Sequence, residues 1–355
     1  MPAFDGVSDL YARTVSDVAL AGAALIVACT ALLLALRLGY QLRRRRRDAL
    51  TGAWQSMLIR SLASPEEPLP PLPRRFAADI LCTWIYLREC LRGDVTERLD
   101  AVARRAGFDQ LARRMARSRG RWRRLVGIAA LGHLRERAAW DELCSIAHSR
   151  HPVESLAAAR ALVHIDVGRG LAAVMPLIAI RADWPPSRVA ALLQDAGPDA
   201  ILEPLTRAAA EAAPASPERA AQLVGYMVLA PSALVAPHVR KLIGGTHDAG
   251  LIRACLHVLS SADDVDLVRP FLAHPYWPVR SEAARTVGRL GTEADVPALT
   301  PLLGDTAWWV RYRTAQAIAS LPAIGAVELR RIAAGHPNPF ARDMIVHVMA
   351  ERQIT

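Results

Sequence analysis

Apolar residues recur at helical spacing along most of the chain, and the pattern itself repeats. The segment from Val279 to Leu290 returns as Val310 to Leu321, with Val, Arg, Ala and Leu at an offset of 31 residues. Related segments open upstream near residues 122, 152, 186, 217 and 248. A helix-turn-helix unit cannot bury its apolar stripe alone, so successive units must stack on one another. The pattern predicts an all-α solenoid with almost no β-strand.

A second pattern lies near the N-terminus, where Val18 to Leu36 contains no charged residue. At about 1.5 Å per residue, this length matches a hydrocarbon core of about 30 Å. Five arginines follow at Arg43 to Arg47, whereas residues 1–17 carry three Asp and one Arg. The positive-inside rule then predicts a single-pass membrane protein with its C-terminal region in the cytoplasm. We expect a transmembrane helix over residues 18–42, after a short non-cytoplasmic leader over residues 1–17.

Two other interpretations of this apolar run are weaker. A cleaved signal peptide has a basic segment before a shorter apolar one, which is the opposite polarity. A buried solenoid helix does not explain the adjoining five arginines. Small residues inside the run form a seam that could pair two spans into a homo-oligomer, although alanine-rich spans often show such a seam by chance; they are Ala24, Ala28, Ala31 and Ala35.

Proline and periodicity divide the rest of the chain. Ser64 to Pro73 contains five prolines, which exclude helix and favour an extended spacer. Residues 43–73 are therefore predicted to form a basic juxtamembrane segment and a proline-rich linker. Within them, Trp54, Met57 and Leu58 lie on a short amphipathic pattern that could rest on the bilayer surface. Residues 74–121 then form an N-terminal helical cap, and residues 122–355 form the repeats.

Charge is unevenly distributed along the chain. The net charge of +10 arises from 43 Arg and one Lys against 34 acids. Residues 41–125 carry a net charge of +11, whereas residues 126–355 are neutral. Anionic lipid headgroups attract such basic clusters, although a solvated face that only sets topology explains the cluster equally well. Nucleic-acid binding is disfavoured by the neutral repeats. The candidate headgroup ligands are Arg43, Arg44, Arg45, Arg46 and Arg47.

The segment from Val279 to Arg311 resembles the HEAT-repeat superfamily, especially its bacterial form related to phycobilisome-lyase-type repeats. The resemblance implies a right-handed α-α superhelix. It also implies a ladder in which an Asp in the turn inside each repeat and an Arg six residues later link neighbouring units. Asp305 and Arg311 match this pattern. Arg280 and Arg342 keep the Arg, but histidines at positions 274 and 336 replace the Asp, and residues 148 and 154 depart at both positions.

No catalytic, cofactor or metal site is predicted. His148, His274 and His336 occupy equivalent turns, but helix layers stack about 8 to 10 Å apart, so two of them two repeats apart cannot share one zinc ion. We interpret them as turn and capping residues. Cysteines show no metal-ligand or disulfide spacing. A loose GxGxxA match at residues 168–173 follows a helix rather than a strand, which favours an inter-repeat turn over a dinucleotide site.

Four tryptophans precede second helices, at residues 184, 277, 308 and 309. Large apolar side chains usually serve packing, so we expect them to join neighbouring repeats. The alternative is an exposed row that serves as a binding hot spot.

The concave surface of HEAT-like arrays, lined by the second helix of each pair, is the predicted partner-binding surface. An early apolar groove that leads into a charged one would suit an amphipathic helix of a partner. A register error of one residue would return the apolar positions to the core. The candidate residues are Val126, Leu156, Leu193, Glu282, Arg285, Arg289, Arg313 and Gln316.

Together with the resemblance, these features predict a single-pass protein of a bacterial inner membrane whose cytoplasmic HEAT-like solenoid serves as a non-catalytic adaptor. By resemblance it binds another protein, such as a membrane-bound enzyme or an export machine of the envelope-polysaccharide type. An enzyme of the bilin-lyase type is the competing class, since its repeats look similar. A nucleic-acid-binding protein is the third alternative.

Overall fold

The computed structural model describes residues 5–63, 68–70, 72–73, 75–91 and 93–354, with side chains from residue 29 onward. Contacts divide the chain into two units, residues 1–130 and 131–355. Every regular element in the described ranges is an α-helix or a 3-10 helix. The prediction of an all-α chain is therefore confirmed for these residues.

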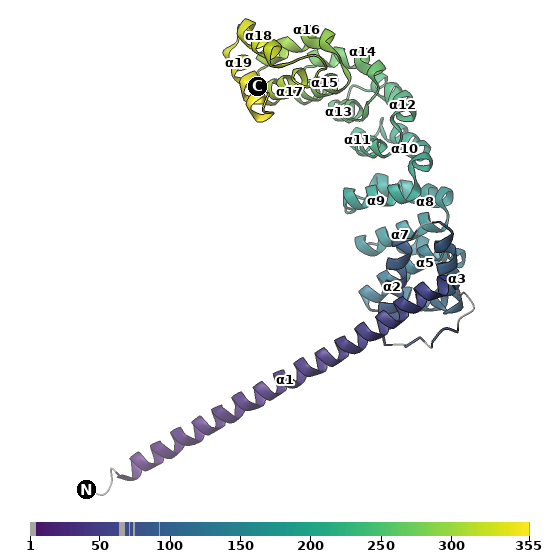
Figure 1. Ribbon diagram of the computed structural model, residues 1–355, viewed down its shortest axis with the longest axis vertical. Helices are drawn as coiled ribbons and strands as arrows, with labels where there is room; N and C mark the ends of the chain where they lie inside the picture. The colour runs from purple at the N-terminus through teal and green to yellow at the C-terminus, as the bar shows by residue number, and fades with distance from the viewer. Residues whose placement is uncertain (1–4, 64–67, 71, 74, 92, 355) are drawn as a thin grey trace. The chain divides into compact units, whose positions relative to one another are not determined.

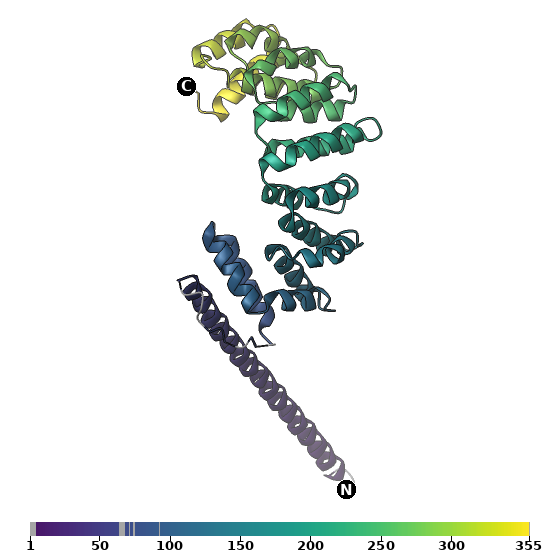
Figure 2. The same ribbon diagram turned by 90° about the vertical axis from the view of Figure 1, so that its right-hand side faces the viewer.

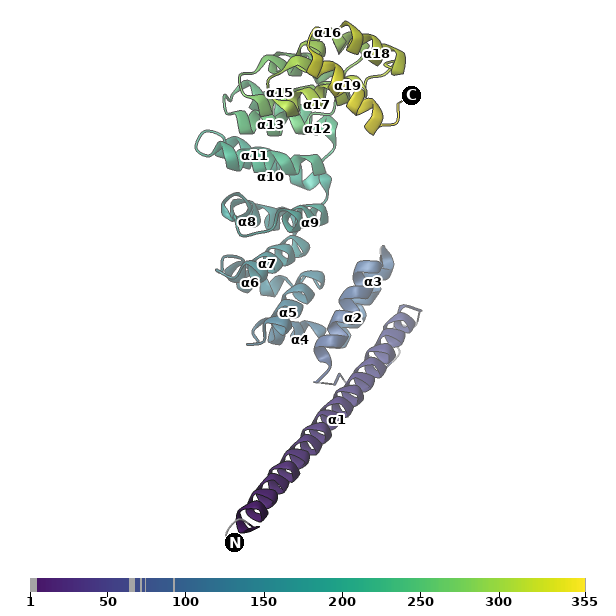
Figure 3. The same ribbon diagram turned by 90° about the vertical axis from the view of Figure 1, so that its left-hand side faces the viewer.

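The first unit begins with one continuous helix, α1 (Asp5–Ala63), whose C-terminal part packs beside α2 and α3 (Figure 3). The core of the first unit contains three packed aromatic rings. The ring of Phe108 lies 5.9 Å from the ring of Trp54 in α1 and 6.1 Å from that of Trp84 in α2, measured between ring centroids. The remaining helices of this unit are α2 (Ala77–Cys90), α3 (Asp94–Arg105), α4 (Phe108–Ala116) and most of α5 (Arg121–His133).

The amphipathic stretch at the end of α1 is part of this core. Trp54, Met57 and Leu58 are 3%, 4% and 0% exposed. The expectation that they rest on a bilayer surface is therefore wrong, because the apolar stripe of α1 packs against α2 and α3.

The expected transmembrane helix lies within α1. Residues 1–4 of the leader are not described, and the side chains of residues 5–28, which include the first part of the expected span, also lie outside the description. No helix in the described part of the chain combines the length and the apolar character that crossing a bilayer requires. In the proline-rich stretch from residue 64 to residue 73, residues 64–67 and 71 are likewise outside the description, and residues 68–70, 72 and 73 form no regular element.

The second unit is a row of helix pairs stacked one after another (Figures 1 and 2). The first helices are α6 (Trp140–Ala147), α8 (Val167–Ile180), α10 (Pro198–Ala212), α12 (Ser232–Gly244), α14 (Val265–Val268), α16 (Val296–Leu299) and α18 (Ala326–Gly335). Short 3-10 turns, η4 (Arg269–Ala273) and η6 (Thr300–Gly304), extend α14 and α16. The second helices are α7 (Pro152–Ile165), α9 (Pro186–Ala196), α11 (Pro217–Tyr226), α13 (Ala249–Val258), α15 (Trp277–Leu290), α17 (Trp308–Ile318) and α19 (Pro339–Glu351).

The second helices begin where the sequence pattern predicts them. Pro152, Pro186 and Pro217 are the first residues of α7, α9 and α11. Proline suits this position because its fixed φ is helical and its missing N–H would have no partner there. Asp248 precedes α13, and its carboxylate accepts the backbone N–H of Leu251 at 2.8 Å. The predicted repeat boundaries are confirmed at these helices.

Neighbouring second helices approach closely at glycine. A Cβ atom added at Gly132 would lie 2.7 Å from the Cα of Ala161, and one added at Gly288 would lie 2.4 Å from the Cα of Ala317. The second pair joins the second helices α15 and α17, and the first joins the last residues of α5, which belong to the second unit, to α7. The absent side chains allow the backbones to touch, so these positions fix the spacing of the stack.

Candidate functional site

The apolar half of the predicted surface does not form. Val126 is 7% exposed and Leu193 is fully buried, so both belong to the core, and only Leu156 is partly exposed. The register of each helix explains the correction. In α9, for example, Val189, Leu192 and Leu193 form one buried stripe at helical spacing that faces the stack. The predicted apolar groove is therefore wrong at these positions.

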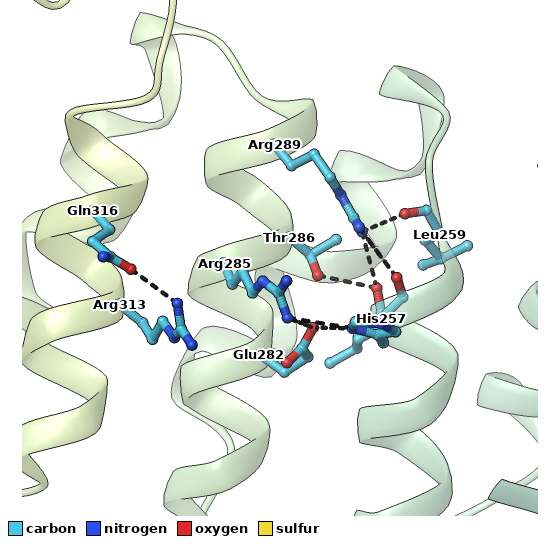
Figure 4. A network of polar contacts seen from close by, with 9 residues as sticks. His257, Leu259, Glu282, Arg285, Thr286, Arg289, Arg313 and Gln316 are labelled. Atoms are coloured by element: carbon cyan, nitrogen blue, oxygen red, sulfur yellow. Dashed lines mark hydrogen bonds and ion pairs between the residues drawn. The ribbon is translucent and has the colours of Figure 1, made fainter. Parts of the chain in front are cut away.

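The charged half of the surface lies on α13, α15 and α17, and Figure 4 shows its side chains. The carboxylate of Glu282 in α15 lies 3.0 Å from Nδ1 of His257 in α13 and 3.6 Å from Nη1 of Arg285. Arg285 also approaches the imidazole of His257 at 3.5 Å. We call the exposed side of these three helices the second-helix face. On it, the Glu282 carboxylate lies next to both the His257 imidazole and the Arg285 guanidinium.

Arg289, on the same face, caps the C-terminal end of α13. Its guanidinium donates to the backbone carbonyls of His257 at 3.2 Å and Leu259 at 2.5 Å, where α13 ends. Thr286 donates its hydroxyl to the carbonyl of Leu256 at 3.0 Å. These bonds satisfy carbonyls that a helix C-terminus leaves without intrahelical partners. Burial lowers the pKa of Arg289 from its ordinary value, although far too little to discharge it.

Arg313 and Gln316 lie on α17 beside this network (Figure 4). Nη1 of Arg313 donates to the side-chain oxygen of Gln316 at 2.9 Å, and its guanidinium carbon lies 5.9 Å from the ring centroid of Tyr312. Both of these contacts are with uncharged groups. Arg313 therefore presents a positive charge that neither of them neutralises.

Three aromatic residues of α17 form an exposed cluster next to Arg313. Trp308 is 45% exposed and Trp309 is 51% exposed. The ring of Trp308 stacks on that of Tyr312 at 5.0 Å, and the ring of Trp309 meets both at steep angles. Tyr312 also donates its hydroxyl to the Glu351 carboxylate of α19 at 2.9 Å. We call Trp308, Trp309 and Tyr312 the aromatic cluster.

Only one of the four tryptophans serves packing as expected. Trp184 is 2% exposed, with the guanidinium of Arg181 5.4 Å from its ring centroid. Trp277 is 43% exposed, and Trp308 and Trp309 pack on their own helix and remain half-exposed. The expectation that all four are buried between repeats is therefore wrong for Trp277, Trp308 and Trp309, which keep about half of their surface exposed.

The Asp-Arg ladder has one rung at the repeat that matched the family pattern. Arg280 of α15 donates Nε and Nη2 to the two carboxylate oxygens of Asp305 at 2.7 and 2.9 Å. Arg311 binds the backbone carbonyl of Asp305 at 2.8 Å. Burial raises the pKa of Asp305, but the hydrogen bonds from Arg280 and the backbone N–H of Ala307, together with the charge of Arg280, outweigh this effect and lower the pKa below its ordinary value. Neighbouring repeats are thus joined by a bidentate ion pair.

A further set of ion pairs, on the first helices, was not predicted. Arg240 donates to the buried carboxylate of Asp264 at 2.6 Å, and Arg269 donates to that of Asp295 at 2.7 Å. Each pair joins one repeat to the next. The sequence contains a signal for the two aspartates, because an Asp-Val pair occurs at residue 264 and again at residue 295, one repeat length of 31 residues later. The Arg partners were harder to find, since they precede the Asp by 24 and 26 residues.

The second helices α7 and α9 are linked by another carboxylate. Asp195 accepts Nε of Arg160 at 2.5 Å and contacts Nε2 of His164 at 3.2 Å. Burial raises the pKa of Asp195, but these two partners outweigh it and bring the pKa to about 2. The imidazole of His164 also lies 4.8 Å from that of His133.

The turn histidines act as predicted. Nδ1 of His274 accepts the backbone N–H of Tyr276 at 3.1 Å, and Nδ1 of His336 accepts that of Asn338 at 3.1 Å. His148 contacts the carbonyl of Cys144 at 2.8 Å. In the part of the chain whose side chains are described, no group of three or more potential metal ligands comes together.

The five consecutive arginines, Arg43 to Arg47, are exposed along α1. Arg44 and Arg47 lie 3.8 and 3.9 Å from the Asp48 carboxylate, and Arg47 lies 3.7 Å from that of Asp79. Such exposed pairs contribute little to stability. The cluster therefore keeps most of its positive charge available.

Paired helices that stack at a regular interval, joined by ion pairs from one pair to the next, define an α-helical repeat protein. Residues 249–319, which span α13 to α17, match the family model of HEAT repeats. The resemblance to HEAT repeats is thus supported where the repeat pattern is strongest.

Solved structures that resemble the chain include two crystal structures of engineered proteins. The first is 14% identical and covers 86% of this chain and 95% of its own, with a TM-score of 0.35. The second is 15% identical and covers 74% of this chain and 93% of its own, with a TM-score of 0.21. A search of curated proteins found no significant match.

Proposed function

We propose that the protein is a non-catalytic adaptor whose second-helix face binds a partner protein. The observation that supports this is that neighbouring arginines on this face make different kinds of contact. Arg289 is committed to the backbone of α13, whereas Arg285 and Arg313 are held only by side chains on the surface. An exposed arginine that does not cap a helix can contact a partner protein, and arginine is enriched in the hot spots of protein interfaces.

Charge and shape favour a protein partner with an acidic contact surface. Arg285, Arg289 and Arg313 together outnumber Glu282 on the face. Complementary charge speeds association and selects partners more than it adds affinity. The repeats supply a rigid, extended surface for such contacts.

A site-specific crosslink tests this proposal in the full-length protein. A photoreactive amino acid placed at Gln316 should trap a partner in cells, and the adduct can be identified by mass spectrometry. The double change Arg285→Glu and Arg313→Glu should reduce that adduct at least tenfold. Arg330→Glu is the control, because Arg330 is exposed, as Arg285 is, but lies on the first helix α18. An adduct that survives the double change would contradict the proposal.

We also infer that α1 holds the adaptor at a membrane. The support is the uncharged run Val18–Leu36 before Arg43–Arg47, together with exposed leucines in the described part of α1, which are Leu32, Leu33, Leu34, Leu36, Leu38 and Leu42. Exposed leucines of this number need an apolar environment. After alkaline carbonate washing, the protein should stay with the membrane pellet. Its release into the supernatant would show that α1 is not an integral anchor.

A further inference from the structure

The turn that joins α4 to α5 carries positive charge that no nearby acidic residue balances. Residues 110–135 contain eight arginines and no Asp or Glu. In the described part of the chain, Arg119, Arg121 and Arg123 form no ion pair, and Arg114 donates Nε to the backbone carbonyl of Gln110 at 3.3 Å. We call the exposed residues of this region the basic turn; they are Arg114, Arg117, Arg119, Arg121, Trp122 and Arg123.

The exposed arginines of the basic turn do not stabilise the helices that carry them. The first turn of α5 contains no acidic residue, although the positive end of a helix dipole favours acids there and disfavours arginine. Arg124 differs from its neighbours, because its Nε donates to the carbonyl of Ser118 at 3.2 Å and so holds the turn in place. The positive charge of the exposed arginines is therefore available to a ligand outside the chain.

Trp122 adds a second property to the basic turn. Its side chain is 53% exposed and is flanked by the exposed Arg121 and Arg123. An indole ring combines an apolar body with one N–H donor, and for this reason Trp is enriched among the headgroups at bilayer surfaces. Arginines around an exposed Trp therefore match a surface that is both anionic and partly apolar, which is the surface of a bilayer with anionic lipid.

The basic turn is attached directly to α1. Phe108, the first residue of α4, packs on Trp54 of α1 with 5.9 Å between the ring centroids. α4 has 9 residues and therefore spans about 13 Å. Both helices belong to the unit of residues 1–130. The basic turn is thus held near the helix that carries the uncharged run and the arginines at residues 43–47.

We propose that the basic turn docks on the anionic lipid surface of the membrane in which α1 is anchored, with its arginines beside lipid phosphates and the indole of Trp122 among the headgroups. This inference rests on the proposed function, because it takes α1 as the anchor. Each basic residue near an anionic leaflet adds to the attraction, and salt weakens it. A second contact of this kind restricts rotation of the first unit about the axis of α1.

Fluorescence quenching by lipid tests the inference in the full-length protein. The protein is reconstituted into nanodiscs that contain brominated phosphatidylcholine, either alone or mixed with phosphatidylglycerol. The difference in quenching between the wild type and Trp122→Phe isolates the signal of Trp122, because the other tryptophans are the same in both proteins. We expect Trp122 to be quenched about threefold more in the anionic discs, and high salt should remove this excess.

Charge variants assign the effect to the arginines, each measured with and without Trp122→Phe. The triple change of Arg119, Arg121 and Arg123 to Gln should lower the quenching of Trp122 in anionic discs about threefold, to the level in zwitterionic discs. The triple change to Lys should preserve the quenching, because an anionic leaflet attracts positive charge and does not require the planar guanidinium. All three arginines are exposed, so the Tm of each variant should match that of the wild type.

A matched control removes the same amount of charge from the second unit. It changes three exposed arginines to Gln and should leave the quenching of Trp122 unchanged; they are Arg188, Arg219 and Arg330. An equal loss of quenching in this control would show that net charge, and not the basic turn, controls the contact, and would contradict the inference.

Two further results would overturn the inference. They are equal quenching of Trp122 in both kinds of disc, and unchanged quenching after the triple change to Gln. If the three arginines instead bind double-stranded DNA while Trp122 is not quenched in anionic discs, the basic turn is a nucleic-acid surface and the inference fails. The anchor is judged separately by whether the protein elutes with the zwitterionic discs. Elution with the discs without quenching of Trp122 would reject the docking of the basic turn and leave α1 as the anchor.

Discussion

Gly288 offers the sharpest test of how the repeats are packed. It lies in α15 where that helix meets α17, and a Cβ added there would be 2.4 Å from the Cα and 2.5 Å from the Cβ of Ala317. Ordinary contact between carbon atoms needs about 3.5 to 4 Å. Gly288→Ala must therefore push the two helices apart by about 1 Å, because neither obstructing atom can rotate away.

Two effects of opposite sign determine the result. Alanine favours a helix over glycine by about 1 kcal/mol. Overfilling a packed interface costs about 1 to 3 kcal/mol, and an obstruction by backbone atoms lies at the upper end. We expect a net loss of about 2 kcal/mol in the free energy of unfolding. For a unit of this size, that loss lowers the Tm by about 4 to 8 °C.

Gly225→Ala is the matched control. Gly225 lies in α11, and a Cβ added there would meet no atom within 4 Å. Only the helix-propensity gain remains, so the Tm should rise by about 2 to 3 °C. Thermal unfolding of both variants is followed by circular dichroism at a helical wavelength. A Gly288→Ala protein as stable as the wild type would refute the close approach of α15 and α17.

Three further predictions concern other residues. Asp195→Asn should lower the free energy of unfolding by about 1 kcal/mol near neutral pH, once solvent screening is allowed for. Because the folded-state pKa of Asp195 is depressed to about 2, this difference should be fully present above pH 4 and vanish as the pH falls toward 2 in urea titrations. Arg289→Ala should lower the free energy of unfolding, measured by urea titration, by about 1 to 3 kcal/mol, since it removes the cap of α13. Arg285→Ala should change this free energy by less than about 0.5 kcal/mol. Similar losses in both variants would contradict the different roles of the two arginines. Burial raises the pKa of Cys255 to about 12, so iodoacetamide should label exposed Cys90 in the native protein and Cys255 only after unfolding, as read by mass spectrometry.

The repeat boundaries could be predicted because local signals mark them. Proline at the first position of α7, α9 and α11 and the cap at Asp248 act within one turn of the chain. Their effect does not depend on the distant parts of the fold. The roles of the turn histidines were found for the same reason, since each histidine bonds the backbone close by in sequence.

The surface could not be predicted as well, because burial depends on neighbours that periodicity does not reveal. A helix in the stack packs against a helix on each side, so its buried face is wider than that of a helix on a sheet. Val126 and Leu193 lie on this wider buried face. Arg285 and Arg289 look alike in the sequence. Only the position of the C-terminal end of α13 separates the capping arginine from the one that faces solvent.

The last turns of α1 have a practical consequence for work on this protein. Trp54, Met57 and Leu58 complete the interior of the first unit, so α1 is at once the proposed anchor and a component of the folded body. A shortened chain that starts after Ala63 would lack these three side chains and leave Phe108 uncovered on one side. One that starts near Asp48 would keep them while discarding the apolar run. Truncation for purification should respect that limit, or aggregation will be mistaken for an inherent property of the repeats.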